Sequence, residues 1–153
     1  VVNSGYHYSL DTTKLSNGVH TISIRETGNN NSQTTIGGVK VTVSNVSRGY
    51  LDTPTDEETV SGTKTVKGWF LDASGVNKVE VLVDGNAAGT AAYGDPRNDV
   101  ERAYPSYNVV NSGYHYSLDT TKLSNGVHTI SIRETGNNNL QMNLNSEKVI
   151  VLN

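Results

Sequence analysis

The chain has 153 residues, no cysteine and a formal net charge of -3, with 34% hydrophobic and 18% charged residues. Twelve Lys and Arg against fifteen Asp and Glu leave no basic field for a phosphate backbone, so we expect no nucleic-acid binding. No apolar run approaches the ~20 residues that span a bilayer, and without cysteine there is neither a disulfide framework nor a thiolate metal site.

A long internal repeat organises the chain. Residues 1–31 are identical to residues 109–139, at an offset of 108, and the copies then diverge, although Lys40/Lys148, Val41/Val149 and Val43/Val151 still agree. The period is close to the ~100 residues of an immunoglobulin-type sandwich. Abundant Val and Thr favour strands, and Asn with Gly favours turns. We therefore expect an all-β fold, an immunoglobulin-like β-sandwich in tandem repeat with about seven strands per unit.

The offset divides the chain unequally. Residues 1–45 match the C-terminal half of a unit, its last three strands; residues 46–49 form a linker, and residues 50–153 form a complete repeat. Three strands expose an apolar face, and about 45 residues bury too little surface to offset chain entropy, so the first segment is expected to need a partner. That partner is either the missing upstream half of its own domain or the 46–108 half of a neighbouring chain. In the second case, the exchange between chains would propagate head to tail into a filament.

The predicted elements of the complete repeat follow in chain order. Strands are expected over 50–54, 63–70, 79–83, 87–92, 114–118, 127–134 and 148–152. Gly68 interrupts the alternation of its strand, which is typical of a bulge, and Asp84-Gly85 is a strong hairpin signal. Residues 93–112 are expected to form a long irregular loop, and Asp119 to cap one helical turn through Lys122.

Several residues are expected to have structural roles. Trp69, the single tryptophan, and the neighbouring Phe70 are predicted to be core aromatics. After the helical turn, Leu123 is expected to pack at the edge of the core, and Gly126 to take a positive φ. His128, Ile130 and Ile132 are expected to share one strand face. The repeat-equivalent residues are Leu15, Gly18, His20, Ile22 and Ile24.

Two histidine positions, each present twice, need a separate interpretation. His128 has the L-x-x-G-x-H context in which sandwiches place a tyrosine-corner residue, so a hydrogen bond from its ring to the backbone is expected rather than metal binding. His115 is expected to be a solvated strand residue. Glu134 shares the parity of Ile130 and Ile132, which places it on the inward face.

The loop around residues 93–107 has the densest mix of functional groups. Aromatic faces stack on sugars while charged groups bind hydroxyls, so Tyr93, Arg97, Tyr104 and Tyr107 are candidate glycan-binding residues. In the alternative interpretation, Arg97 between Asp95 and Asp99 pins the loop to the sandwich, with the tyrosines packed beneath it.

Candidate chemistry beyond glycan binding is sparse. Asp95 and Asp99 are candidate calcium ligands, although Arg97 between them disfavours a cation. No nucleophile context, metal-ligand spacing or phosphate loop is present, so the chain is expected to be no enzyme and to use no cofactor.

Three stretches carry a family resemblance: VSGTKTVKGWFLDASGVNKVEVLVDG (60–85), YGDPRNDVERAYPSY (93–107) and NSGYHYSLDTTKLSNGVHTISI (111–132). With them the chain resembles the bacterial Ig-like domains repeated in Gram-positive, Firmicutes surface and secreted cell-wall-associated proteins. The resemblance covers residues 50–153, and residues 1–45 resemble the second half of the same domain. It implies an extracellular, cell-surface or cell-wall-associated structural protein that extends, displays or assembles, with neighbouring repeats or wall glycan as partners. A carbohydrate- or cell-wall-binding module is the alternative it leaves open.

Overall fold

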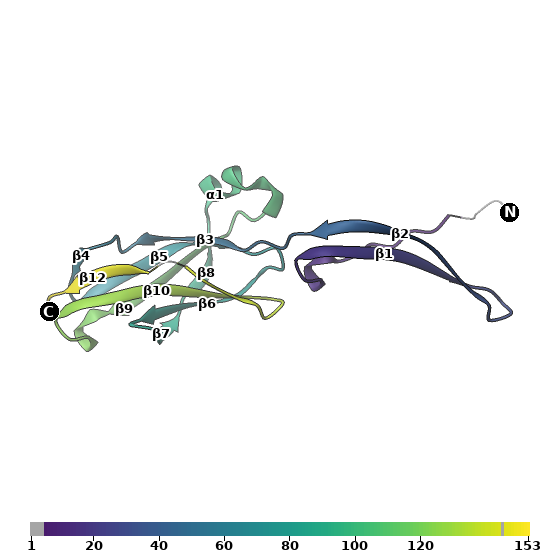
Figure 1. The fold of residues 1–153 in the computed structure, drawn as a ribbon. Coiled ribbons are helices and arrows are strands. Elements are labelled where there is room, and N and C mark those ends of the chain that lie inside the picture. Colours follow the sequence, from purple (N-terminus) through teal and green to yellow (C-terminus); the bar gives the residue numbers. More distant parts are fainter. Residues whose placement is uncertain (1–4, 145) are drawn as a thin grey trace. The chain divides into compact units, whose positions relative to one another are not determined.

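The computed structural model describes residues 5–144 and 146–153, which are mostly in strands (Figure 1). By its internal contacts the chain forms two compact units, Val1–Asn45 and Val46–Asn153.

The second unit contains two sheets. A four-stranded antiparallel sheet has the order β3-β5-β9-β8, with bounds β3 Arg48–Thr53, β5 Thr63–Leu71, β9 Gly113–Asp119 and β8 Ala92–Asp95. The other sheet has the order β4-β12-β10-β6-β7, with β11 also pairing with β10; the bounds are β4 Glu58–Val60, β6 Val76–Val83, β7 Asn86–Thr90, β10 Gly126–Gly136, β11 Gln141–Asn143 and β12 Glu147–Val151. β4 and β12 pair in parallel.

The two sheets enclose one hydrophobic core, which makes the unit the expected immunoglobulin-like β-sandwich. Ile130 and Ile132 on β10 are fully buried, and the Phe70 and Tyr114 rings of the opposing sheet lie 6.0 Å apart between centroids. The other core members are Leu51, Val60, Val66, Val79, Val81, Val83, Ala91, Leu118, Val149 and Val151, with Leu123 packed against them. Ten strands are present in the described part of this unit rather than about seven, because β4, β8 and β11 are additional strands of three or four residues.

The prediction that Trp69 is a core aromatic is wrong. Side chains alternate along β5, so Val66, Gly68 and Phe70 point inward, and Trp69 belongs to the outer face, where it is half-buried. The core aromatics are Phe70 and Tyr114.

The bulge predicted at Gly68 lies instead on the neighbouring strand. The register between β3 and β5 shifts between Leu51 and Thr53, while β5 pairs without interruption with β9. Gly68 is needed for close approach: a Cβ there would lie 2.0 Å from the Tyr50 carbonyl oxygen and 2.5 Å from the Tyr114 hydroxyl. Because glycine has no side chain, the Tyr114 hydroxyl can reach the Tyr50 carbonyl oxygen, to which it donates a hydrogen bond at 3.2 Å.

Three other boundaries differ from the sequence-based expectation. Arg48 and Gly49, in the expected linker 46–49, are the first residues of β3. The expected strand 87–92 divides into β7 and β8, which belong to different sheets. The expected irregular loop 93–112 contains part of β8, the helix α1 (Asn98–Ala103) and a 3-10 turn, η2 (Pro105–Tyr107), and Val100 of α1 is buried.

The turn predictions agree with the structure. Asp84 and Gly85 both have positive φ, at 51° and 80°, as a tight hairpin between β6 and β7 requires. The Asp119 carboxylate accepts a hydrogen bond from the Thr121 amide at the start of η3 (Thr120–Lys122).

In its described part, residues 5–45, the first unit has two strands rather than three. A 3-10 turn, η1 (Thr12–Lys14), precedes β1 (Gly18–Thr27), which pairs antiparallel with β2 (Gln33–Val43). The stretch from Tyr6 to Leu10 is not a strand, although the same residues form β9 in the second unit. The reason is that β9 pairs with β5 and β8, and residues 5–45 contain no counterpart of either strand.

The two copies of one isoleucine allow a matched test of this description. We expect Ile130→Ala to destabilise the second unit by about 2–5 kcal/mol, because it leaves a cavity in a closed core. The same change at the repeat-equivalent Ile22 should leave the unfolding midpoint of that unit unchanged. Urea unfolding followed by the fluorescence of Trp69, the single tryptophan, reports on the second unit. Equal shifts from the two variants would contradict a core confined to residues 46–153.

Candidate functional site

Arg97 fastens the segment that carries α1 to the sandwich. Its Nε and Nη2 atoms donate to the two carboxylate oxygens of Asp99 at 2.9 and 2.7 Å, and Nη1 donates to Asp52 at 2.6 Å. The hydrogen bonds from Arg97 hold the pKa of Asp99 far below its usual range. The pinning arginine was identified from the sequence, but its partners are Asp99 and Asp52 rather than Asp99 and Asp95.

The three candidate tyrosines hold the same segment against the sheets. The Tyr93 hydroxyl donates to the Phe70 carbonyl oxygen at 2.9 Å, and the Tyr107 hydroxyl donates to the Val46 carbonyl oxygen at 2.6 Å. The Tyr104 ring packs against Trp69, with centroids 5.5 Å apart. Of the three, only Tyr104 lies beside other aromatic groups in an arrangement that a ligand could share.

Asp95 and Asp99, the candidate calcium ligands, have different partners. Asp95 lies 2.6 Å from His115 Nδ1, whereas Asp99 is held by Arg97. Among residues 5–144 and 146–153, no group of three or more His, Cys, Asp or Glu side chains is arranged to hold a metal ion. The arrangement therefore gives no support to a calcium site here.

An aromatic cluster lies on the outer face of the four-stranded sheet. Tyr50 and Trp69 are directly paired across β3 and β5, and Tyr50 is 59% exposed. The Arg48 guanidinium lies 5.5 Å from the centroid of the Tyr104 ring, in a cation–π contact. Beside the cluster is an open pocket of about 240 Å³ lined by Asp52, Lys67, Gly68, Asp95, Arg97, Gly113 and Tyr114.

Sequence reasoning missed Tyr50 and Asp52. Both point outward from β3, and each meets its partner only across the sheet: Tyr50 meets Trp69, and Asp52 meets Arg97, 45 residues away. The sequence places residues 50 and 52 at alternate positions of one predicted strand, but it does not show that β3 pairs with β5.

The His128 ring lies at the corner between η3 and β10. Its Nε2 lies 2.9 Å from the Ser124 carbonyl oxygen, and its Nδ1 lies 2.6 Å from the Asp84 carboxylate. The hydrogen bond to Asp84 raises the pKa of His128. Asp84 also accepts a hydrogen bond from the Thr129 amide, which lowers its own pKa. The ring thus ties the β6–β7 hairpin to β10, a structural arrangement with no open ligand position.

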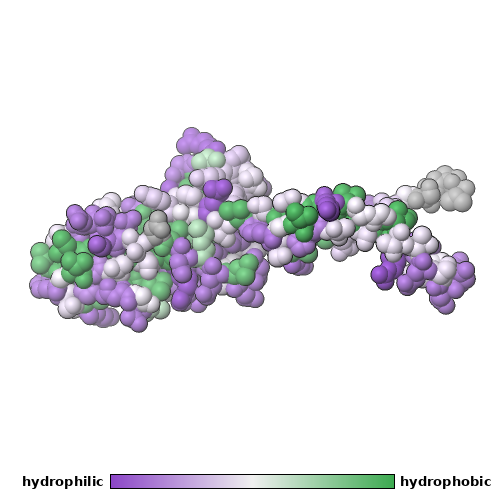
Figure 2. Space-filling view, in the orientation of Figure 1, coloured by the Kyte–Doolittle hydropathy of each residue, from purple (hydrophilic) through white to green (hydrophobic). Residues whose placement is uncertain are grey.

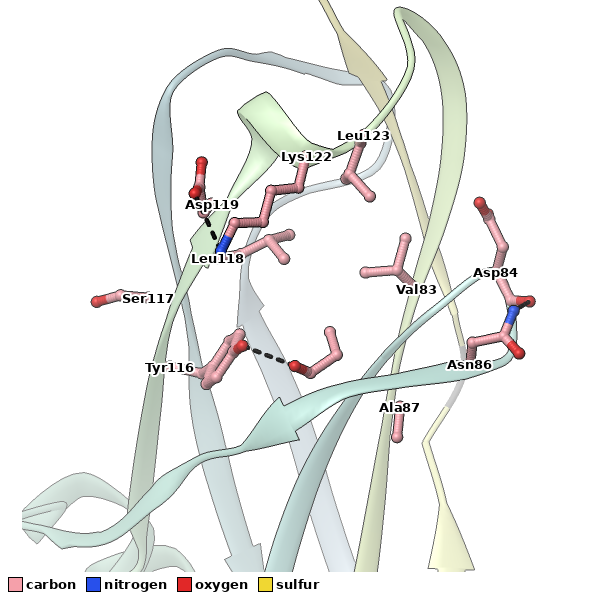
Figure 3. A pocket seen from close by; sticks show the side chains of 11 residues that line it. Val83, Asp84, Asn86, Ala87, Tyr116, Ser117, Leu118, Asp119, Lys122 and Leu123 are labelled. Atoms are coloured by element: carbon pink, nitrogen blue, oxygen red, sulfur yellow. Dashed lines mark hydrogen bonds and ion pairs between the residues drawn. The ribbon is translucent and has the colours of Figure 1, made fainter.

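A second open pocket, of about 480 Å³, lies between the β6–β7 hairpin and the end of β9 (Figure 3). Its wall combines Val83, Ala87, Leu118 and Leu123 with polar groups at the rim. Several of these polar groups are paired within the protein: the Tyr116 hydroxyl donates to the Ala88 carbonyl oxygen at 2.9 Å, and Lys122 lies 3.5 Å from Asp119. The close-up shows no convergent set of acid, base and nucleophile among the drawn residues.

Glu134 is the one fully buried carboxyl group in the described residues. It lies on the inward face of β10, as its parity indicated, and neither carboxyl oxygen has a hydrogen-bond partner there. Burial, followed by the nearby charge of Asp72, raises the pKa of Glu134 to about 7. Burial and then the charge of Glu134 raise the pKa of Tyr93 to about 12. A neutral carboxyl is thus favoured inside the sandwich.

These features define a β-sandwich module of the immunoglobulin class, whose polar groups mostly bind one another. A profile of the bacterial Ig domain matches residues 50–132, more than half of the chain, and the chain belongs to that family. It is a family of non-catalytic modules.

Among solved structures, an endo-β-1,4-mannanase from Thermotoga petrophila is similar at a TM-score of 0.53 and 18% identity, over 71% of this chain and 20% of that one. The fibronectin(III)-like modules of CbhA from Clostridium thermocellum align at 0.49 and 15% identity, over 89% of this chain and 63% of theirs. Domains 4 and 5 of the S-layer protein SbsC align at 0.39 and 18% identity, over 90% and 59%. The chain therefore spans less than two thirds of each. The mannanase likeness shows a shared fold alone.

The search of curated proteins found no match. In the described residues no helix has the length and apolar character needed to span a membrane.

The buried Glu134 predicts a specific dependence of stability on pH. Because its pKa in the folded protein, about 7, lies above its ordinary value of 4.5, its contribution is most favourable below pH 4.5 and is lost as pH rises towards 7. At about 1.4 kcal/mol per pKa unit, the free energy of unfolding should fall by roughly 3 kcal/mol between pH 5 and pH 8. Glu134→Gln should remove most of this fall.

The matched control is Glu26→Gln, the same change at the exposed repeat-equivalent residue. Because the pKa of His128 is also raised, the protein should lose some further stability as pH rises above 6.5. This smaller loss should persist in both variants, since neither changes His128. Urea unfolding followed by Trp69 fluorescence at pH 5 and pH 8 measures these effects. A Glu134→Gln variant that retains the full pH dependence would show that Glu134 is not its source.

Proposed function

We propose that this protein is an extracellular, non-enzymatic structural repeat of a bacterial cell surface or cell wall, which extends, displays or assembles what it carries. Membership of the bacterial Ig domain family supports this function, as does the 108-residue internal repeat. The described polar clusters also support it, since they fasten one part of the module to another.

The observation that carries the proposal is where the chain enters and leaves the second unit. Near the start, Arg48 pairs with Leu71, the last residue of β5. At the other end, the Asn153 side chain accepts a hydrogen bond from the Gly62 amide, just before β5 begins. Entry and exit are thus separated by the nine residues of β5, roughly 26 Å at about 3.3 Å per residue. Each such module adds its own length to a tandem chain.

Polar contacts at both ends of β5 support the proposal that the module resists distortion along this direction. The two ends of β5 are held by different parts of the chain: Ser47 bonds to Asp72 beyond its end, and the Asn153 side chain donates to the Thr120 carbonyl oxygen near its start, at 2.7 Å. Extension and display require only neighbouring repeats. Assembly through residues 1–45 additionally requires a second 46–108 half to cover them.

Chains lengthened by whole repeats test the extending function. We expect one, two and three further copies of residues 46–153, added after Asn153, each to increase the maximum dimension in small-angle scattering by a nearly constant step of at least ~25 Å. Each junction repeats the natural Asn45–Val46 order. A dimension that grows only as the cube root of mass would show that repeats collapse on one another, and would contradict a spacer.

The second candidate function is binding of cell-wall or other carbohydrate. The specific observation in its favour is the aromatic cluster of Tyr50, Trp69 and Tyr104, next to the pocket lined by Asp52, Lys67 and Arg97. Aromatic faces beside charged groups suit sugar rings and their hydroxyls.

A pull-down on purified peptidoglycan and wall polysaccharide tests this candidate. If the cluster binds sugar, the double variant Tyr50→Ala with Tyr104→Ala should lose retention by at least ~10-fold, since it removes the exposed Tyr50 ring and the half-buried Tyr104 ring. Tyr8→Ala removes an exposed tyrosine outside the cluster and should be retained like the wild type. Absence of wild-type retention, or equal loss with Tyr8→Ala, would exclude the cluster as a glycan site.

A further inference from the structure

Identical residues have different exposure in the two units. Tyr6 is 69% exposed, whereas Tyr114, its copy, is 1% exposed. Leu10 is 40% exposed, whereas its copy Leu118 is 4% exposed. Because the sequences of these segments are identical, the difference in exposure comes from the residues that pack on them.

The exposed face of the first unit is a groove of about 540 Å³ (Figure 2 shows apolar residues at the surface of this unit). The apolar side chains of its wall are Tyr6, Tyr8, Leu10, Leu15, Ile22 and Ile24. The sheet beneath it has two strands, β1 and β2, and no second layer within the described part of the unit. This is the face of a sandwich with one side missing.

The second unit shows which segment covers this face. Residues 46–108 supply Leu51, Val66 and Phe70 from one sheet and Val79 and Val81 from the other, and all five share one core with the copies of the groove residues. They also supply hydrogen-bonding edges: β5 pairs with β9 from Thr63 to Trp69, and β6 pairs with β10 from Val76 to Val83. The covering segment therefore matches the face in both apolar contacts and backbone register.

The part of the repeat that has diverged keeps the positions needed for this contact. Val41 and Val43 stand where Val149 and Val151 are fully buried, and Ile36 stands where Leu144 packs on the core. Where Met142 touches the core, the first unit has Thr34. Three of these four core-facing positions thus remain apolar, although most of the surrounding residues have changed.

We infer that Val1–Asn45 is an acceptor that binds a second copy of the 46–108 half-sandwich. This inference rests on the proposed structural function and names its partner. The chain's own 46–108 half does not serve, for a reason of geometry. In a completed unit, the last residue, Asn153, lies at the opposite end of β5 from residues 46–48, yet Asn45 is joined directly to Val46.

The number of half-repeats limits exchange between 153-residue chains. These residues contain two acceptor halves, 1–45 and 109–153, but one 46–108 half. Exchange between two such chains therefore leaves as many acceptors uncovered as before, and buries no additional apolar surface. The acceptor takes up a 46–108 half that is not already held by residues 109–153.

The test mixes the full 153-residue chain with a separate 46–108 fragment and measures complex formation by analytical ultracentrifugation. We expect a 1:1 complex in which amides of β1 from Ile22 to Arg25 gain protection from hydrogen exchange. A chain of residues 46–153, which has a closed core of its own, should bind no fragment. Binding to that chain, or no binding to the full chain, would overturn the inference, whereas the scattering test of repeat length would be unaffected.

Two substitutions in β1 give a matched pair. Ile22→Asp places a charge under the expected partner and should weaken binding by at least ~10-fold. Val19→Asp is the control, because Val19 and its covered-unit copy Val127 are equally exposed, at 67%. Equal weakening by both variants would overturn the assigned face.

If the free fragment aggregates, the same half can be fused before Val1, which restores the natural order of residues 108 and 109. We then expect two cooperative sandwiches and protected β1 amides. Unprotected β1 amides in this fusion would overturn the inference.

Discussion

The structure depends on burying one apolar surface between two sheets that are each built from both halves of the repeat. Residues 46–108 supply β3, β5 and β8 to one sheet and β4, β6 and β7 to the other, while residues 109–153 supply β9 to the first and β10, β11 and β12 to the second. Neither half can therefore close a core alone. Ile130 and Ile132 are fully buried only because Val66 and Phe70 face them from the other half. The two-stranded first unit is the direct consequence of having one half.

Outside this core, the polar groups mainly hold the module together. Arg97 joins α1 to Asp52, His128 joins the β6–β7 hairpin to β10, and Asn153 closes the end of the sandwich. Such internal pairing fits a mechanical module better than a reactive site, because Arg97, His128 and Asn153 already bind partners within the protein. Glu134 is the exception: a buried carboxyl with no partner among the described residues makes stability, rather than catalysis, sensitive to pH.

Local signals in the sequence were sufficient for much of the fold. Asp84-Gly85 predicted the hairpin because both residues accept positive φ, and the alternation from His128 to Glu134 predicted the buried face of β10. The candidate site was less accessible. Asp52 reaches Arg97, and Tyr50 lies beside Trp69, only through the pairing of β3 with β5, which no local pattern encodes. Trp69 was misplaced because hydrophobicity alone does not reveal which face of a strand a residue occupies.

The duplicated segment separates what sequence determined from what tertiary structure decided. In both copies the aspartate caps the 3-10 turn, Gly18 and Gly126 have φ of 128° and 129°, and Asn31 and Asn139 both have φ of 64°. These features are the same because their hydrogen bonds and steric limits lie within a few residues. Strand formation after Gly113 but not after Gly5, and burial of Tyr114 but not of Tyr6, differ although the sequence does not. Both require backbone partners and an apolar layer from a distant segment, and only the second unit has that segment in place.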